Sequence, residues 1–292
     1  MKRPQLSPAL LRGLSAAVFL GTQGCVLAWP NQADVGAPPN SVGAQAVEFP
    51  SQSGSTIHAW LIPGKPGAGA VLLLHGVGDD RRSMLSRARF LHNAGFTVLT
   101  PDFQAHGESR GRYVTFGALE SFDALAALTY LKEHARGERV GVIGVSMGGA
   151  AALLGPQPLP ADALVLESVY PTIGEAVVDR LHVWLGPLGF LSGSIGPALL
   201  GIVGPEIGVD DDRMRPIDVI ERVAEPLLMI AGAVDRYTPL REARALFARA
   251  RSPKELWVVQ GAGHVDMHDF APAEYEQRVG SFLSSHLRSA SF

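Results

Sequence analysis

A short glycine-rich motif places a serine where it could act as a nucleophile. Residues 144–148 read Gly-Val-Ser-Met-Gly, with Ser146 at the centre. They follow an apolar run at 140–143 that is typical of a buried strand. A serine on a sharp turn from strand to helix has strained backbone angles, and a side chain at Gly144 or Gly148 would collide with nearby backbone. We therefore predict that Ser146 is a catalytic nucleophile and that the two glycines support its turn.

A serine hydroxyl becomes a good nucleophile only when a base takes its proton, and an acid usually orients that base. Asp235 follows the apolar run 227–230, and His264 follows the run 256–259. Loops after the carboxyl ends of parallel strands lie at one edge of a sheet, so we expect both side chains close to Ser146. We predict that His264 is the general base and that Asp235 holds it in place.

Each of these two residues also has a simpler interpretation. Asp235 could cap a helix that begins near Pro239, and His264 could be an ordinary histidine of a surface loop. His268 is a second candidate base, but it lacks the Gly-Ala-Gly approach that precedes His264. Three strand ends that supply Ser, Asp and His in this order favour the catalytic interpretation.

A negative charge that develops on a substrate oxygen needs backbone donors from two different loops. The segment 74–78 reads Leu-His-Gly-Val-Gly and follows another apolar run. We assign the oxyanion hole to the backbone amides of Val77 and Met147. Gly76 lets the chain approach the substrate, and His75 is expected to hold the loop together rather than to act as a base.

The elements that must position these residues follow an alternating pattern of short apolar runs and longer helical segments, which predicts a mostly parallel sheet flanked by helices. We expect about eight strands in one domain, 46–288, beginning with an antiparallel hairpin. The predicted strands are 46–50, 56–62, 71–74, 97–100, 140–143, 163–166, 227–230 and 256–259. The predicted helices are 82–93, 239–250, 273–287 and one around 119–131, whose core-facing stripe is expected to comprise Leu119, Phe122, Leu125, Leu128 and Leu131.

One segment, 170–215, is too long for a single crossover helix between two strands. Its middle part, 183–203, is apolar and rich in glycine. We predict a small helical lid inserted after the sixth strand. An acyl-binding cap, a surface that leans on a membrane and two short helices packed on the domain would all have such a composition.

The N-terminus has the layout of an export signal, with basic residues, then the apolar stretch 14–20, then small residues. We expect a signal peptide at 1–25, a flexible linker at 26–45 and export to the cell envelope, the periplasm or the medium. Cys25 resembles the lipidated cysteine of bacterial lipoproteins, although the residues before it match that motif imperfectly. Lipidation and membrane attachment at Cys25 are therefore one of two alternatives, secretion being the other.

Composition excludes several classes of function. The chain has 25 Lys and Arg residues against 28 Asp and Glu, a net charge of −3, so nucleic acid is not an expected partner. A single cysteine rules out an intrachain disulfide and a cysteine-based metal cluster. We expect no cofactor and no metal ion.

Taken together, the motifs resemble the α/β-hydrolase superfamily. The resemblance rests on Leu-His-Gly at 74–76, the segment 102–109, the serine motif at 144–148, Asp235 and the Gly-His pair at 263–264. It covers about 46–286 and is strongest for the serine-aminopeptidase-like branch. It implies the α/β-hydrolase fold and hydrolysis of esters, thioesters or amides without a cofactor.

We expect a serine hydrolase that cleaves carboxylic esters or thioesters of small molecules through an acyl-enzyme. A peptidase or amidase of the same superfamily is the first alternative, although no acidic clamp for an amino terminus stands out except Asp210, Asp211 and Asp212. A surface-tethered binding protein without catalysis is the second. The sequence does not indicate the oligomeric state.

Overall fold

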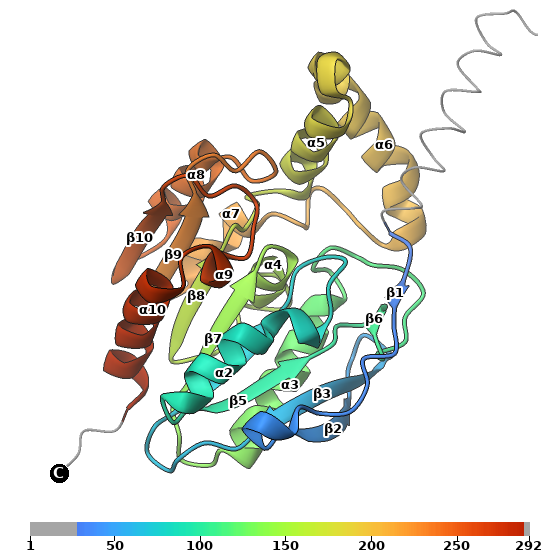
Figure 1. Ribbon diagram of the computed structural model, residues 1–292. Coiled ribbons are helices and arrows are strands. Elements are labelled where there is room, and N and C mark those ends of the chain that lie inside the picture. The colour runs from blue at the N-terminus through green and yellow to red at the C-terminus, as the bar shows by residue number, and fades with distance from the viewer. Residues whose placement is uncertain (1–27, 289–292) are drawn as a thin grey trace, which may run out of the picture.

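The computed structural model describes residues 28–288, and an eight-stranded sheet forms its centre (Figure 1). The strand order is β10-β9-β8-β7-β4-β5-β3-β2. These strands are β2 (Gln45–Pro50), β3 (Thr56–Ile62), β4 (Ala70–Leu74), β5 (Thr97–Pro101), β7 (Val140–Val145), β8 (Ala163–Glu167), β9 (Leu227–Gly232) and β10 (Lys254–Val259). Strand β3 is antiparallel to β2 and β5, and the other pairs are parallel. The predicted sheet, including its antiparallel hairpin, is confirmed.

Alternate side chains of the central strands enter two separate cores, one on each face of the sheet. On β4, Leu72 and Leu74 belong to one core and Val71 and Leu73 to the other. The first core is covered by α3 (Glu120–His134), α4 (Met147–Leu153) and α8 (Leu240–Arg249), and the second by α2 (Leu85–Asn93) and α10 (Pro272–Leu287). Burial on both faces explains why these strands are continuous apolar runs.

Shorter helices complete the loops around the sheet. They are η1 (Asn40–Val42), η2 (Arg81–Met84), α7 (Pro216–Val219), η4 (Ile220–Arg222) and α9 (Met267–Phe270).

The predicted leucine stripe of α3 is only partly correct. Leu128 and Leu131 are buried, whereas the three earlier members are only half-buried. A three-residue spacing falls about 60° short of a full helical turn at each step, so the stripe drifts away from the core. The true buried face uses Asp123, Ala124 and Ala127 instead.

The insert after β8, the sixth strand of the sheet along the chain, contains α5 (Ile173–Trp184), η3 (Gly186–Leu191) and α6 (Ser192–Ile207). These helices project beyond the sheet in Figure 1, and we call them the lid. The two ends of the insert are joined, because the Ile173 N–H donates to Met214 O at 3.0 Å and the Ile217 N–H donates to Pro171 O at 3.0 Å.

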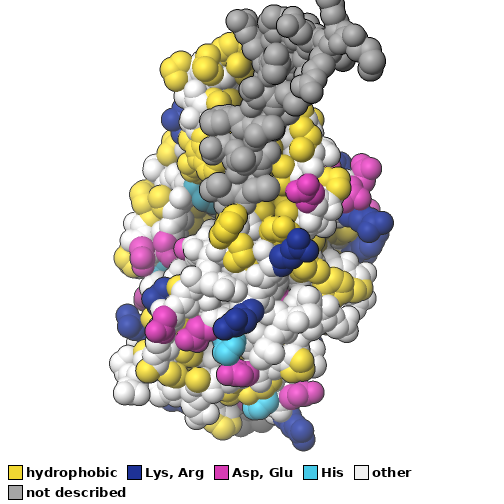
Figure 2. All heavy atoms as spheres, turned by 90° about the vertical axis from the view of Figure 1, so that its right-hand side faces the viewer, with side chains coloured by type: hydrophobic (Ala, Val, Ile, Leu, Met, Phe, Trp, Pro, Cys, Tyr) yellow, Lys and Arg dark blue, Asp and Glu magenta, His cyan; other side chains and the backbone are white. Residues whose placement is uncertain are grey.

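The lid surface is strongly apolar. Its run Gly186–Ile207 is, within residues 28–288, the one helical segment whose length and composition would allow it to cross a membrane, with a mean hydropathy of 1.5. Trp184, Leu188 and Phe190 are exposed. Figure 2 shows apolar side chains gathered over this end of the molecule.

Residues 28–45 are packed on the domain, which differs from the flexible linker expected at 26–45. Strand β1 (Asn31–Gln32) pairs in parallel with β6 (His106–Gly107), and Ala28, Val35 and Val42 are buried. The expected signal peptide and Cys25 lie outside the described residues.

Candidate active site

Ser146 lies at the turn between β7 and α4, and its backbone is strained there. Its φ is 49° and its ψ is −111°, a conformation that residues other than glycine rarely adopt. The Ser146 N–H donates to Glu167 O at 2.7 Å. A Cβ on Gly144 would lie 2.6 Å from Gly149 Cα, and one on Gly148 would lie 2.3 Å from Leu74 O. The turn therefore requires both glycines, as the sequence predicted.

Asp235 and His264 come together from the loops that follow β9 and β10. Asp235 Oδ2 lies 2.8 Å from His264 Nδ1 and accepts a 2.7 Å hydrogen bond from Thr238 Oγ1. Asp235 Oδ1 accepts from the Tyr237 N–H at 2.8 Å and the Thr238 N–H at 2.9 Å. The carboxylate thus organises its own loop and also holds the imidazole, whereas helix α8 begins at Leu240 without a side-chain cap, so Asp235 does not cap that helix.

The charge of Asp235 is stabilised where it lies. Burial alone would raise the pKa of this carboxyl, but the hydrogen bond and charge of His264, together with the hydrogen bonds from Thr238, bring the pKa below its usual range. An ionised Asp235 fixes the tautomer that carries the proton on Nδ1 and leaves Nε2 of His264 free to accept a proton.

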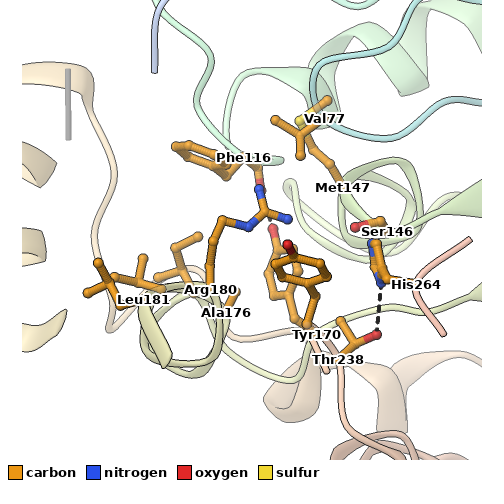
Figure 3. Close-up of a pocket in the computed structure, with 13 residues that line it drawn as sticks. Val77, Phe116, Ser146, Met147, Tyr170, Ala176, Arg180, Leu181, Thr238 and His264 are labelled. Atoms are coloured by element: carbon orange, nitrogen blue, oxygen red, sulfur yellow. Dashed lines mark hydrogen bonds between the residues drawn. The ribbon is translucent and has the colours of Figure 1, made fainter. Parts of the chain in front are cut away.

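Ser146 and His264 line the same two cavities. Figure 3 shows the His264 ring beside Ser146, with Thr238 on the other side of the ring. Ser146 is only 6% exposed and borders both cavities. The structure therefore brings together all three residues that the sequence analysis selected.

The predicted oxyanion loop lies opposite this pair. Val77 and Met147 both line the apolar cavity with Ser146. Within residues 28–288 neither backbone N–H has a hydrogen-bond acceptor, so both are available to a substrate oxygen. Gly76 lies close to Ser146, because a Cβ on Gly76 would be 3.8 Å from the serine Cβ.

His75 holds this loop in place through hydrogen bonds of its ring nitrogens, as predicted. The Phe103 N–H donates to its Nε2 at 3.1 Å, so the proton is on Nδ1, which donates to Gly76 O at 2.7 Å. Burial, and then the neighbouring His106, lower the pKa of His75 to about 3. A neutral, fully buried histidine with both nitrogens engaged is not a base for the reaction.

The segment 102–109 supports the same loop. The Gly78 N–H donates to His106 Nε2 at 3.3 Å. The guanidinium of Arg81 is buried between Asp102 and Glu108 and pairs with both carboxylates. These contacts tie the segment to residues 78–81.

Two cavities of different character meet at Ser146. The first is apolar, with Phe116, Tyr170, Ile173, Val177 and Leu181 among its lining, and a second apolar cavity between α5 and α6 shares Phe116, Ile173 and Val177 with it. The other main cavity, which we call the polar cavity, has a volume of about 210 Å³ and a mixed lining that includes the polar side chains of Asp79, Ser83, Arg87, Glu167 and Asp266. The site can thus receive an apolar chain under the lid and a polar group on the other side of the serine.

Sequence reasoning missed two residues around the site. Thr238 contacts both Asp235 and His264, at 2.7 and 3.4 Å. Arg180 of the lid lines both main cavities and lies over the ring of Tyr237. The Thr-Pro pair at 238–239 was a usable signal for the start of helix α8 just after it, whereas nothing in the sequence marks Arg180.

His268, the other candidate base, lies away from the serine. Its Nε2 is 3.0 Å from Glu276 Oε1, and its ring packs against Phe90 and Tyr275. Within residues 28–288, no group of three or more His, Cys, Asp or Glu side chains is arranged to hold a metal ion.

Comparison with known proteins agrees with this geometry. The sequence pattern of the Alpha/beta hydrolase family matches residues 71–278, so the chain belongs to that family and is a hydrolase. It is 32% identical over 221 residues to the uncharacterized protein Rv2307c of Mycobacterium tuberculosis, covering 74% of this chain and 70% of the relative. It is 24% identical over 244 residues to the uncharacterized protein YqkD of Bacillus subtilis, covering 82% and 79%.

Among solved structures, the chain is similar to the esterase Pf2001 of Pyrococcus furiosus. The TM-score is 0.73 at 25% identity, over 89% of this chain and 98% of the esterase. An esterase of Exiguobacterium antarcticum has a TM-score of 0.60 at 16% identity, over 82% and 99%, and shares the fold.

Proposed function

We propose that this hydrolase is a serine esterase that cleaves carboxylic esters of small molecules through an acyl-enzyme. The observation that carries the proposal is the 2.8 Å contact between Asp235 Oδ2 and His264 Nδ1, on an imidazole that shares two cavities with Ser146. The likeness to the Pyrococcus furiosus esterase also supports it.

In the first half of the reaction, His264 Nε2 takes the proton of Ser146 as the hydroxyl oxygen attacks the ester carbonyl carbon. Asp235 stabilises the imidazolium that forms, and the amides of Val77 and Met147 stabilise the oxyanion. The tetrahedral intermediate then collapses, and the alcohol departs with the proton from His264. In the second half, water attacks the acyl-enzyme with His264 again as the base, and the acid product leaves Ser146 as it was.

The apolar cavity under the lid suits the acyl chain. Its lining near Ser146 is aliphatic and aromatic, and the neighbouring apolar space between α5 and α6 extends it. This supports the acyl-binding role of the lid among the three alternatives that its composition allowed. Acyl chains of short to medium length are therefore the proposed substrates.

The test compares the purified full chain with Ser146→Ala on p-nitrophenyl esters of graded acyl length and on aminoacyl-nitroanilides. We expect ester turnover with an initial burst, loss of turnover in Ser146→Ala, and fluorophosphonate labelling of Ser146 alone. Cleavage of the anilides but not the esters would indicate a peptidase. A complete absence of turnover and labelling would favour a binding protein.

A further inference from the structure

Arg180, on helix α5 of the lid, brings a positive charge into the candidate site. Its side chain lines the apolar cavity and the polar cavity, both of which also contain Ser146 and His264. In Figure 3 the guanidinium points away from α5 into the pocket that Val77, Phe116 and Ser146 border. A cation is therefore close to the atoms that react.

This guanidinium has no acid to pair with. Its Cζ lies 5.2 Å from the centre of the Tyr237 ring, but among residues 28–288 no carboxylate oxygen lies within 4.0 Å of it and no hydrogen bond engages it. By contrast, the buried Arg81 and Arg87 each pair with two carboxylates. Burial lowers the pKa of Arg180, yet an arginine side chain stays charged in proteins.

A half-buried charge without a partner costs free energy, and a bound anion would offset that cost. In the apolar cavity Arg180 is the one formally charged lining residue apart from a protonated His264. Asp79 lines the polar cavity but forms no ion pair with Arg180 within 4.0 Å. An anion brought in by the substrate would complete this arrangement.

We propose that Arg180 binds an anionic group, a carboxylate or a phosphate, carried by the alcohol portion of the ester. The inference rests on the proposed function. The acyl chain occupies the apolar cavity, so the alcohol faces the polar cavity on the other side of Ser146. Arg180 borders both cavities and can reach an anion a few bonds from the scissile oxygen. A guanidinium offers the paired donors that a carboxylate or phosphate accepts.

A different role would make Arg180 a latch that keeps the lid in place. Its guanidinium stacks over Tyr237, whose ring meets the His264 ring edge-on at 5.6 Å between centroids. A latch would act on every substrate alike, because it would shift the base itself. A binding residue would act only on substrates that carry the anion.

The experiment uses a pair of esters with one acyl group and one phenol skeleton. These are 4-(butyryloxy)benzoate, which is anionic, and its neutral methyl ester. We measure kcat/KM, because it reports acylation, the step in which the alcohol still occupies its subsite. In Arg180→Gln we expect kcat/KM for the anionic ester to fall about 10- to 100-fold, mostly through a higher KM. A fall of this size corresponds to the loss of a hydrogen bond to a charged group. The neutral ester should change less than about threefold.

Three controls sharpen the result. Arg180→Lys should retain part of the preference for the anionic ester. Arg236→Gln removes an exposed positive charge beside Asp235 and should leave the preference unchanged, because solvent screens that charge. A monoglutarate ester of the neutral phenol carries its anion on the acyl side. If Arg180→Gln lowers kcat/KM only for that ester, the anion would have to lie on the acyl side, which would overturn the assignment to the alcohol. Equal losses for the anionic and neutral esters would overturn the binding role.

A binding measurement separates this inference from the proposed function. We titrate benzoate, phenyl phosphate and neutral benzyl alcohol into the wild type and Arg180→Gln by calorimetry, which needs no turnover. Tighter binding of either anion to the wild type supports the inference, and comparison of benzoate with phenyl phosphate shows which anion is preferred. Equal binding to both proteins overturns it. Absence of ester cleavage and of Ser146 labelling would refute the esterase alone.

Discussion

Asp179 on lid helix α5 and Glu242 on α8 share a single guanidinium, that of Arg241. Arg241 Nη2 lies 3.2 Å from Asp179 Oδ1 and 2.7 Å from Glu242 Oε1. Asp179 Oδ2 and Glu242 Oε2 are both buried without another partner among the described residues. A proton on one of the two carboxyls would let it donate to the other, so a protonated pair fits this contact between the lid and the main domain.

The stability of the protein should therefore fall as the pH rises toward 8. Burial, and then the hydrogen bond and charge of Asp179, raise the pKa of Glu242 from 4.5 to about 8. A raised folded-state pKa gives a stabilisation that is complete below pH 4.5 and is lost as the pH rises through 8. The free energy of unfolding should decline by at most about 1.4 kcal/mol per pH unit in this window.

Glu242→Gln tests this dependence, because the amide stays neutral at every pH. Thermal unfolding from pH 5 to pH 9 should show a smaller decline for the variant than for the wild type. Glu255→Gln, which alters an exposed carboxyl 3.6 Å from Arg278, serves as the control and should follow the wild type. Parallel curves for all three proteins would show that Glu242 does not carry the proton.

The role of Asp235 can be measured separately from its role in the loop. Asp235→Asn should lower kcat for a neutral ester by about 10³- to 10⁴-fold, because the amide favours the wrong imidazole tautomer and cannot stabilise the imidazolium. Thr238→Val removes one 2.7 Å hydrogen bond to the same carboxylate and should cost no more than about tenfold. A kcat for Asp235→Asn within tenfold of the wild type would leave Asp235 as a loop cap only.

The turn at Ser146 should not tolerate a methyl group at Gly148. The new Cβ would lie 2.3 Å from Leu74 O and 2.6 Å from His75 O, both of which are backbone atoms. We expect Gly148→Ala to lower the free energy of unfolding by about 1–3 kcal/mol and to abolish activity, as measured by urea denaturation and ester turnover. Gly201→Ala on α6 meets no atom within 4 Å and should be neutral or stabilising by up to about 1 kcal/mol. Similar effects of the two changes would contradict the steric argument.

Arg87 joins three segments of the chain behind the serine. Its Nη2 lies 2.7 Å from Glu167 Oε2, and its Nη1 pairs with Asp266. Arg87→Met should cost about 3–5 kcal/mol, because it leaves the carboxylate of Glu167 buried without its cation. Arg213→Ala breaks an exposed ion pair and should cost less than about 1 kcal/mol. Denaturation midpoints measure both, and a loss below about 1 kcal/mol for Arg87→Met would contradict the ion-pair argument.

The sequence was most informative where a local pattern determines the structure. Each predicted strand lies within two residues of the observed one. The central strands are buried on both faces and are therefore continuous apolar runs. Ser146, Asp235 and His264 were found because each follows such a run. Contacts between distant positions leave no local signal: Arg87 Nε reaches the hydroxyl of Tyr275, 188 positions away.

The same limit explains the two errors in the fold. Residues 30–45 have the composition of a flexible segment, but Asn31 and Gln32 pair with β6 and Val35 and Val42 are buried against the domain. The leucine stripe of α3 seemed to mark a buried face, yet the helix buries small and polar side chains such as Ser121 and Asp123. Only the neighbouring elements decide which face of a helix is covered.

The joined ends of the lid insert make it an exchangeable part of the molecule. The chain leaves the domain at Pro171 and returns at Ile217, and a hydrogen bond of 3.0 Å links these two residues. A shorter or longer insert could begin at Pro171 and end at Ile217 without displacing β8 or β9. Substrate range can therefore change during evolution, or by grafting a lid from a relative, while Ser146 and His264 keep their places.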